Sequence, residues 1–190
     1  MIPVGMVYDH IKVSNEKVKS DDLAEKVFSD NQITKYFIGK DGLSGLGISE
    51  ADNKIYTLSR SLKTENFKLS TYSFEDLFEV KLIEDEETVI SANRLSQLGG
   101  ALVGGAAFGA VGAIVGGSGG KQHSQKEVRK INLELVFDSI DNPLFSVSFM
   151  NEDLFMKSYD PKYKEYFAEA NKWYKSFTVI LKRNELNRNH

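Results

Sequence analysis

The feature that most constrains this chain is a concentration of glycine in one short, uncharged stretch. Ten of the 15 glycines lie between Gly99 and Gly120, and the 26 residues from 95 to 120 carry no charged side chain. The central run over 98–117 contains only glycine and apolar residues. Each glycine in a helix surrounded by water costs about 1 kcal/mol relative to alanine. A solvent-exposed helix is therefore a poor account of this stretch.

Small residues recur along the stretch at a spacing typical of helices that approach each other closely. A strict i, i+4 row is formed by Ala101, Gly105, Gly109, Ala113 and Gly117. We call residues 95–121 the insert and interpret its small-residue row as a glycine zipper. The residues predicted to contact a membrane or another copy of the chain are Gly100, Ala101, Leu102, Val103, Gly104, Gly105, Phe108, Gly109, Val111, Gly112, Ala113, Ile114, Val115, Gly116 and Gly117.

Three interpretations of the insert compete. Twenty apolar residues meet the length rule for a single membrane span, but strand patterns of one domain flank the insert, and one domain cannot lie on both sides of a bilayer. In the second interpretation, arms over 98–108 and 110–117 form a hairpin that enters one leaflet or packs in an oligomer. The third is a loop, or packing against the chain's own domain, without a membrane role. We favour the hairpin and keep the other two open.

Basic side chains flank the insert on both sides. Arg94 precedes it, and Lys121, Lys126, Arg129 and Lys130 end or follow it. Juxtamembrane cations are attracted to anionic lipid headgroups. We therefore expect these five side chains to face a membrane surface if the insert enters one.

Outside the insert, the chain shows the period-2 alternation of half-buried antiparallel strands. The alternation is clearest where Ile131, Leu133, Leu135 and Phe137 share one face. An acidic turn over 84–87 separates two of the strands and is expected to be solvated. Four glycines over 39–47 match no phosphate-binding motif and are interpreted as turns between strands. About seven strands are predicted, over 46–49, 54–59, 67–72, 78–83, 88–91, 128–137 and 144–150.

Two helices are expected at the ends of the chain. A short one over 20–28 has Ser20 or Asp21 as its predicted N-cap. A second begins at Asp160-Pro161, a cap followed by proline at the first helical position, and runs for about 25 residues at 3.6-residue periodicity. The buried stripe of this C-terminal helix is predicted to contain Tyr163, Phe167, Ala170, Trp173 and Phe177.

Over about 45–181 the chain combines a series of strands, the segment YSFEDLFEVKLIED, a late strand pair and a helix with a central Trp. This combination resembles the pleckstrin-homology (PH) superfold. With its glycine-rich insert, the chain is similar to small PH-like proteins of Gram-positive bacteria and phages. The resemblance implies a mainly-β α+β fold, an antiparallel barrel or sandwich capped by the C-terminal helix. The expected layout is an N-terminal extension (1–40), the first part of the PH-like domain (41–94), the insert (95–121) and the second part of the domain (122–190).

No catalytic constellation is found. The chain has no cysteine, its three histidines (His10, His123 and His190) lack metal-ligand spacing, and there is no GxSxG elbow. We expect no enzyme activity, no cofactor and no metal. Lys+Arg of 24 against Asp+Glu of 27 gives a net charge of −3, which argues against nucleic-acid binding.

The PH resemblance raises phosphoinositide binding, but acidic residues interleave the basic residues of the first hairpin, Lys54, Arg60, Lys63 and Lys68, so a solvated surface is favoured. We expect a non-enzymatic binding or assembly module. It would be cytoplasmic and peripheral or monotopic at the inner face of the cytoplasmic membrane. Its partners would be that membrane, further copies of itself as a homo-oligomer, or another protein. The alternative is a soluble self-assembling effector or immunity factor in phage–host conflict, whose zipper mediates oligomerisation or triggered membrane insertion.

Overall fold

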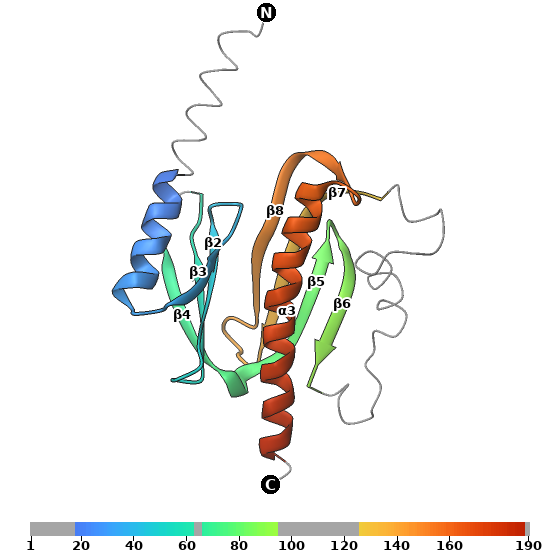
Figure 1. The fold of residues 1–190 in the computed structure, drawn as a ribbon. Helices are drawn as coiled ribbons and strands as arrows, with labels where there is room; N and C mark the ends of the chain where they lie inside the picture. The colour runs from blue at the N-terminus through green and yellow to red at the C-terminus, as the bar shows by residue number, and fades with distance from the viewer. Residues whose placement is uncertain (1–17, 63–65, 95–125, 189–190) are drawn as a thin grey trace, which may run out of the picture. The chain divides into compact units, whose positions relative to one another are not determined.

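The computed structural model describes residues 18–62, 66–94 and 126–188 (Figure 1). The chain divides into two compact units, Met1–Thr71 and Tyr72–His190. Within the described residues, eight strands form two four-stranded antiparallel sheets, with helical residues before the first strand and a long helix after the last. The mainly-β α+β class is confirmed. The count exceeds the seven predicted strands because Lys35–Ile38 also forms a strand, β1.

The first unit combines helical residues 18–30 with a sheet of order β1-β2-β3-β4. The remaining strands are β2 (Ser44–Ser49), β3 (Lys54–Ser59) and β4 (Lys68–Ser73). The predicted capping role of Ser20 and Asp21 is wrong, since both lie inside the helical residues. The Ser20 hydroxyl instead donates to the carbonyl of Gly42 at 2.6 Å, which ties the helix to the β1–β2 turn.

Phe28 is the centre of this unit's core. Its ring is fully buried among Ala24, Ile33 and Leu58. Gly45 and Gly47 both lie in β2, which begins two residues before the predicted strand over 46–49, and they let the helix approach the strand. A Cβ at position 45 would meet the Phe28 ring at 3.1 Å, and one at position 47 would lie 2.8 Å from an Ile33 methyl. Two of the four glycines over 39–47 therefore serve close packing.

The second unit contains a sheet of order β6-β5-β7-β8. A single 3-10 turn, η1 (Phe74–Asp76), leads into β5 (Leu77–Glu84), which is followed by β6 (Glu87–Asn93). After the insert come β7 (Glu127–Phe137) and β8 (Leu144–Lys157). β8 runs beyond the predicted 144–150 because a bulge, where Arg129 faces residues 152–155, lets it continue pairing with β7 as far as Lys157.

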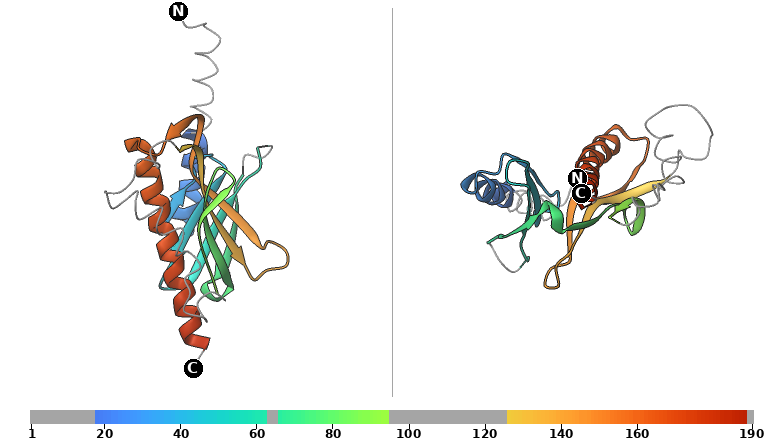
Figure 2. Two further views of the ribbon diagram at one scale, coloured as in Figure 1. Left: turned by 90° about the vertical axis from the view of Figure 1, so that its right-hand side faces the viewer. Right: turned by 90° about the horizontal axis from the view of Figure 1, so that it is seen from below.

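Helix α3 (Pro161–Arg188) covers β5, β7 and β8 (Figures 1 and 2). Its inner stripe carries the five residues named from periodicity, all 4% exposed or less: Tyr163, Phe167, Ala170, Trp173 and Phe177. Near its end, the buried amide of Asn184 donates to the carbonyl of Phe74. The helix is thereby held against the sheet along most of its length.

Removing the Phe28 ring from the core of the first unit should strongly destabilise that unit. We expect Phe28→Ala to lower the free energy of unfolding by about 3–5 kcal/mol, the usual range for a buried phenylalanine. The matched control is Leu62→Ala, since Leu62 is 87% exposed in the same unit, and its effect should stay within about 0.5 kcal/mol. Urea unfolding of the full chain measures both, and equal effects would contradict the assigned core.

Candidate functional site

The predicted functional segment is the insert, and its fifteen predicted contact residues lie outside the described residues. The structure instead describes the frame that holds it. Arg94 is the last described residue before the insert, and Lys126 is the first one after it. Each of these two residues makes specific contacts with the sheet of the second unit.

Arg94 is buried at the end of β6, with 8% of its surface exposed. Its guanidinium donates to the carbonyls of Glu75 and Leu77, the latter at 2.7 Å, and lies 5.8 Å from the centroid of the Phe78 ring. A buried cation requires partners of this kind. The expectation that Arg94 faces lipid headgroups is therefore wrong: this side chain fixes the chain where the insert begins.

Lys126 is held at the other end of the insert by a buried carboxylate. Its ammonium lies 2.7 Å from Oε2 of Glu84, which is 3% exposed. The hydroxyl of Tyr163, at the start of α3, donates to the other oxygen of the same carboxylate. Burial, followed by this hydrogen bond and the charge of Glu84, raises the pKa of Tyr163. Three elements, β5, α3 and the start of β7, therefore meet at Glu84.

Glu84 corrects the prediction of a solvated acidic turn over 84–87. It continues the inward phase of β5, in which Val80 and Leu82 are fully buried. The sequence already contained a signal for this burial, because Glu84 stands at an inward position of an alternating strand. An inward carboxylate needs a buried hydrogen-bond partner. The partner could not be identified from the sequence, since Tyr163 is 79 positions away.

The two anchors lie at opposite ends of β5. Asn93, beside Arg94, pairs with Glu79, whereas Ile131 pairs with Glu84. Both β6 and β7 are antiparallel to β5, so they are parallel to each other with β5 between them. The chain between Arg94 and Lys126 must therefore run the length of the sheet, about 27 Å for an eight-residue strand.

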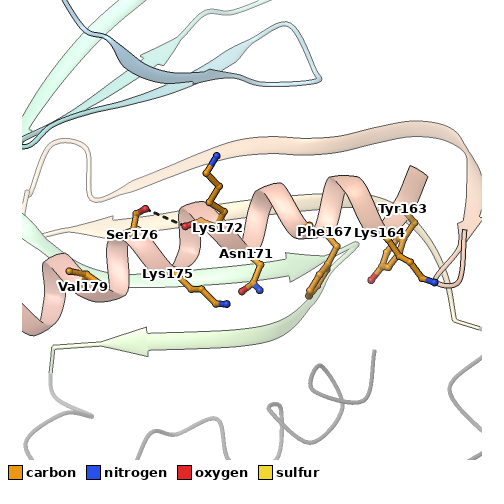
Figure 3. A pocket seen from close by; sticks show the side chains of 9 residues that line it. Tyr163, Lys164, Phe167, Asn171, Lys172, Lys175, Ser176 and Val179 are labelled. Atoms are coloured by element: carbon orange, nitrogen blue, oxygen red, sulfur yellow. Dashed lines mark hydrogen bonds between the residues drawn. The ribbon is translucent and has the colours of Figure 1, made fainter. Parts of the chain in front are cut away.

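A groove of about 810 Å³ runs along α3 from Tyr163 to Val179. Its described lining includes an i, i+4 row with an aromatic end at Tyr163 and Phe167, then Asn171 and Lys175, with Val179 at the far end. Figure 3 shows Phe167, Asn171 and Lys175 projecting on the side of the helix along which β5 and β6 run. Sequence periodicity assigned Tyr163 and Phe167 to the core and gave no reason to expect a groove beside them.

The other candidate residues are not brought into one site. Of the hairpin cations, Arg60 donates to the Gly42 carbonyl at 3.0 Å and lies over the Phe67 ring, while Lys63 lies outside the described residues. The three histidines, His10, His123 and His190, also lie outside them. Among the described residues, no three His, Asp or Glu side chains are grouped so as to hold a metal ion.

One comparison with known proteins gives a match. A family model described as "Glycine zipper containing PH domain" matches residues 32–151. These residues run from the start of the first sheet, through the insert, to the bulge of β8. No curated protein and no solved structure matches the chain.

The Tyr163–Glu84 contact should make the stability of the domain sensitive to alkaline pH. Because the pKa of Tyr163 is raised on folding, the folded domain keeps a proton that the unfolded chain loses above pH of about 10. The stabilisation is complete below that pH and is lost as pH rises further. Burial likewise raises the pKa of Tyr166 and Tyr174, and Glu25 raises that of Tyr36, so Tyr163 supplies one part of the slope.

We therefore expect Tyr163→Phe to be less stable than the wild type at pH 7 and to lose stability less steeply between pH 9.5 and 11. Urea unfolding at several pH values measures this slope. The control is Tyr159→Phe, because Tyr159 is 54% exposed, and it should retain the wild-type slope. Identical slopes in the two variants would argue against the buried contact.

Proposed function

This chain belongs to the family of glycine-zipper-containing PH domains, and from that premise we propose that it is a non-enzymatic module that associates with the cytoplasmic membrane through its insert. The observation that carries the proposal is the anchoring of both insert ends, at Arg94 and Lys126, in one sheet. An apolar segment fixed in this way keeps its domain next to whatever the segment binds.

The anchors also favour shallow insertion over a single span. β6 and β7 both pair with β5, so the two flanks of the insert belong to one folded sheet. A bilayer core of about 30 Å cannot separate two flanks that lie in the same sheet. None of the helices among the described residues is both long and apolar enough to cross a membrane. We therefore propose that the insert lies in one leaflet, with the domain on the cytoplasmic side.

The described surface near Lys126, where the chain returns to the sheet after the insert, also supports membrane association. Leu154 is 82% exposed and Phe155 is 54% exposed on the bulge of β8, with the Arg129 guanidinium 4.4 Å from the centroid of the Phe155 ring. Apolar tips combined with cations suit the interface between acyl chains and anionic headgroups. Leu154 and Phe155 lie on β8 and Arg129 lies on β7, at the end of the sheet to which the insert returns.

The second candidate is a soluble module that self-assembles through the zipper. It is favoured by the five-membered row of small residues in the insert, which lets backbones approach closely in any helix pair. In that case the partner is another copy of the chain, and lipid is not required.

Vesicle co-sedimentation separates the two functions. We expect the wild type to sediment with vesicles containing phosphatidylglycerol. A variant in which residues 99–120 are replaced by an equally long Gly/Ser sequence should remain in the supernatant. Equal length matters because removing 99–120 leaves nine residues between the anchors. Nine residues span at most about 32 Å, little more than the length of the sheet, so the deletion would change the constraint on the anchors as well as the apolar segment.

Gly105→Leu and Gly109→Leu add apolar surface but remove the flat ridge. If lipid is the partner, both variants should keep vesicle binding. If self-association is the function, light scattering should show an oligomer of the wild type that both variants dissociate. A wild-type protein that is monomeric and does not bind vesicles would contradict both proposals.

A further inference from the structure

The late part of β8 projects from the second unit's sheet. Residues 152–155 all lie opposite Arg129, because the pairing of β7 with β8 changes from Lys130–Asn151 to Val128–Met156. The extra residues of a bulged strand have no partner position across the ladder, and the strand bends there. We call residues 152–155 the β8 tip. Its two large apolar side chains, Leu154 and Phe155, are 82% and 54% exposed.

Contacts on both sides hold the β8 tip in place. The end of β8 and the start of α3 lie together (Figure 1). The Glu152 carboxylate accepts from the ammonium of Lys162 at 2.8 Å and from the hydroxyl of Tyr166 at 2.9 Å, both on α3. On the other side, the Arg129 guanidinium contacts the Phe155 ring. Because the tip is already ordered by these contacts, a partner would lose less affinity in ordering it.

The β8 tip is joined to the chain that leaves the insert. The backbone N–H of Ser158 donates to the carbonyl of Lys126 at 2.9 Å, and Lys157 pairs with Glu127. Lys126 is the first described residue after the insert. A surface that meets the returning end of the insert therefore lies within reach of the tip.

The area of exposed apolar surface indicates which kind of partner fits. Leu154, Phe155 and Tyr159, the last 54% exposed, together offer about 400 Å², since a whole aromatic side chain buries about 150–250 Å². A specific protein–protein interface takes about 800 Å² from each partner. The headgroup region of a bilayer sets no such minimum, and it accommodates single aromatic and aliphatic side chains. The area therefore favours lipid over a protein partner.

Two cations lie against the exposed rings. The Arg129 guanidinium is 4.4 Å from the centroid of Phe155, and the Lys157 ammonium is 5.8 Å from that of Tyr159. Basic side chains beside apolar surface can keep their charge at the headgroup level while the apolar part goes deeper. The exposed residue Asp153 limits the net positive charge. Contact therefore depends on the apolar side chains, with attraction to anionic headgroups as an addition.

The opposite end of the sheet offers a natural comparison. Ile140, in the turn between β7 and β8, is 100% exposed, and Leu144 is 57% exposed. These two residues lie about 30 Å from the tip along the strands. The turn over 138–143 contains two aspartates and no basic residue. Two apolar pairs of similar size thus differ in the charge beside them.

We propose that the β8 tip is a second membrane-contact site, at which Leu154 and Phe155 enter the headgroup region while Arg129 and Lys157 bind anionic lipid headgroups. The second unit then docks with the tip end of its sheet toward the bilayer. This inference rests on the proposed membrane function and deepens it, because it adds a contact within the described domain and an orientation.

Fluorescent labelling tests the orientation, since the chain contains no cysteine. Leu154→Cys and, as the control, Ile140→Cys are each labelled in the full-length protein with the environment-sensitive fluorophore NBD. Vesicles containing phosphatidylglycerol are then added. We expect the label at position 154 to brighten and shift its emission to shorter wavelength, and the label at position 140 to keep the emission it has in water.

A pair of matched double variants tests the contribution to binding. We expect Leu154→Ser with Phe155→Ser to raise the lipid concentration for half-maximal co-sedimentation at least about tenfold, because two apolar side chains no longer leave water. The control, Ile140→Ser with Leu144→Ser, removes an exposed apolar pair at the other end of the sheet and should leave this concentration unchanged.

The outcomes separate this inference from the proposed function. A label at position 154 that stays in water while the protein sediments with vesicles would overturn the inference alone. Equal shielding at positions 154 and 140, or a change that follows protein concentration and not lipid, would also overturn it. Shielding at position 154 that survives the Gly/Ser replacement of residues 99–120, with undiminished vesicle binding, would support the tip and contradict binding through the insert. Absence of vesicle binding would overturn both.

Discussion

The position of β5 between two parallel strands is the constraint on which the second unit depends. Because β6 and β7 flank β5 in parallel, the glycine-rich insert begins at one end of the sheet and returns at the other. The connection between these parallel strands is therefore a crossover, and any role with lipid or protein partners must be compatible with ends that lie a strand's length apart.

Buried charge secures both ends of the crossover. Arg94 is fixed by carbonyls at the start of β5, and Lys126 is fixed by a carboxylate at its end. Glu84 also receives the Tyr163 hydroxyl, so the same group fixes the start of α3. Glu84 is the buried member of this pair, since the Lys126 side chain is 45% exposed, and removing a partner of Glu84 would leave a buried carboxylate less well compensated. The frame around the insert is thus specified by a few polar groups, while the insert itself has no charge.

Much of this fold could be predicted from local patterns. Alternation in β7 and helical periodicity in α3 are dictated by one buried face each, and both elements were found where the pattern indicated. The errors arose where a residue serves a distant contact. Gly45 was assigned to a turn but accommodates the Phe28 ring from within β2, and Glu84 was assigned to solvent but binds Tyr163. Contacts of this kind depend on the tertiary arrangement, which single-sequence periodicity does not report.

The anchored ends of the insert support one account of the proposed function, in which a folded sheet holds both ends of an apolar segment next to a membrane. The most direct test is the solvent accessibility of a spin label at position 110, measured by electron paramagnetic resonance with and without anionic vesicles. The account predicts that vesicles shield the label from a water-soluble nickel chelate and leave it accessible to oxygen. An accessibility that vesicles do not change would contradict it.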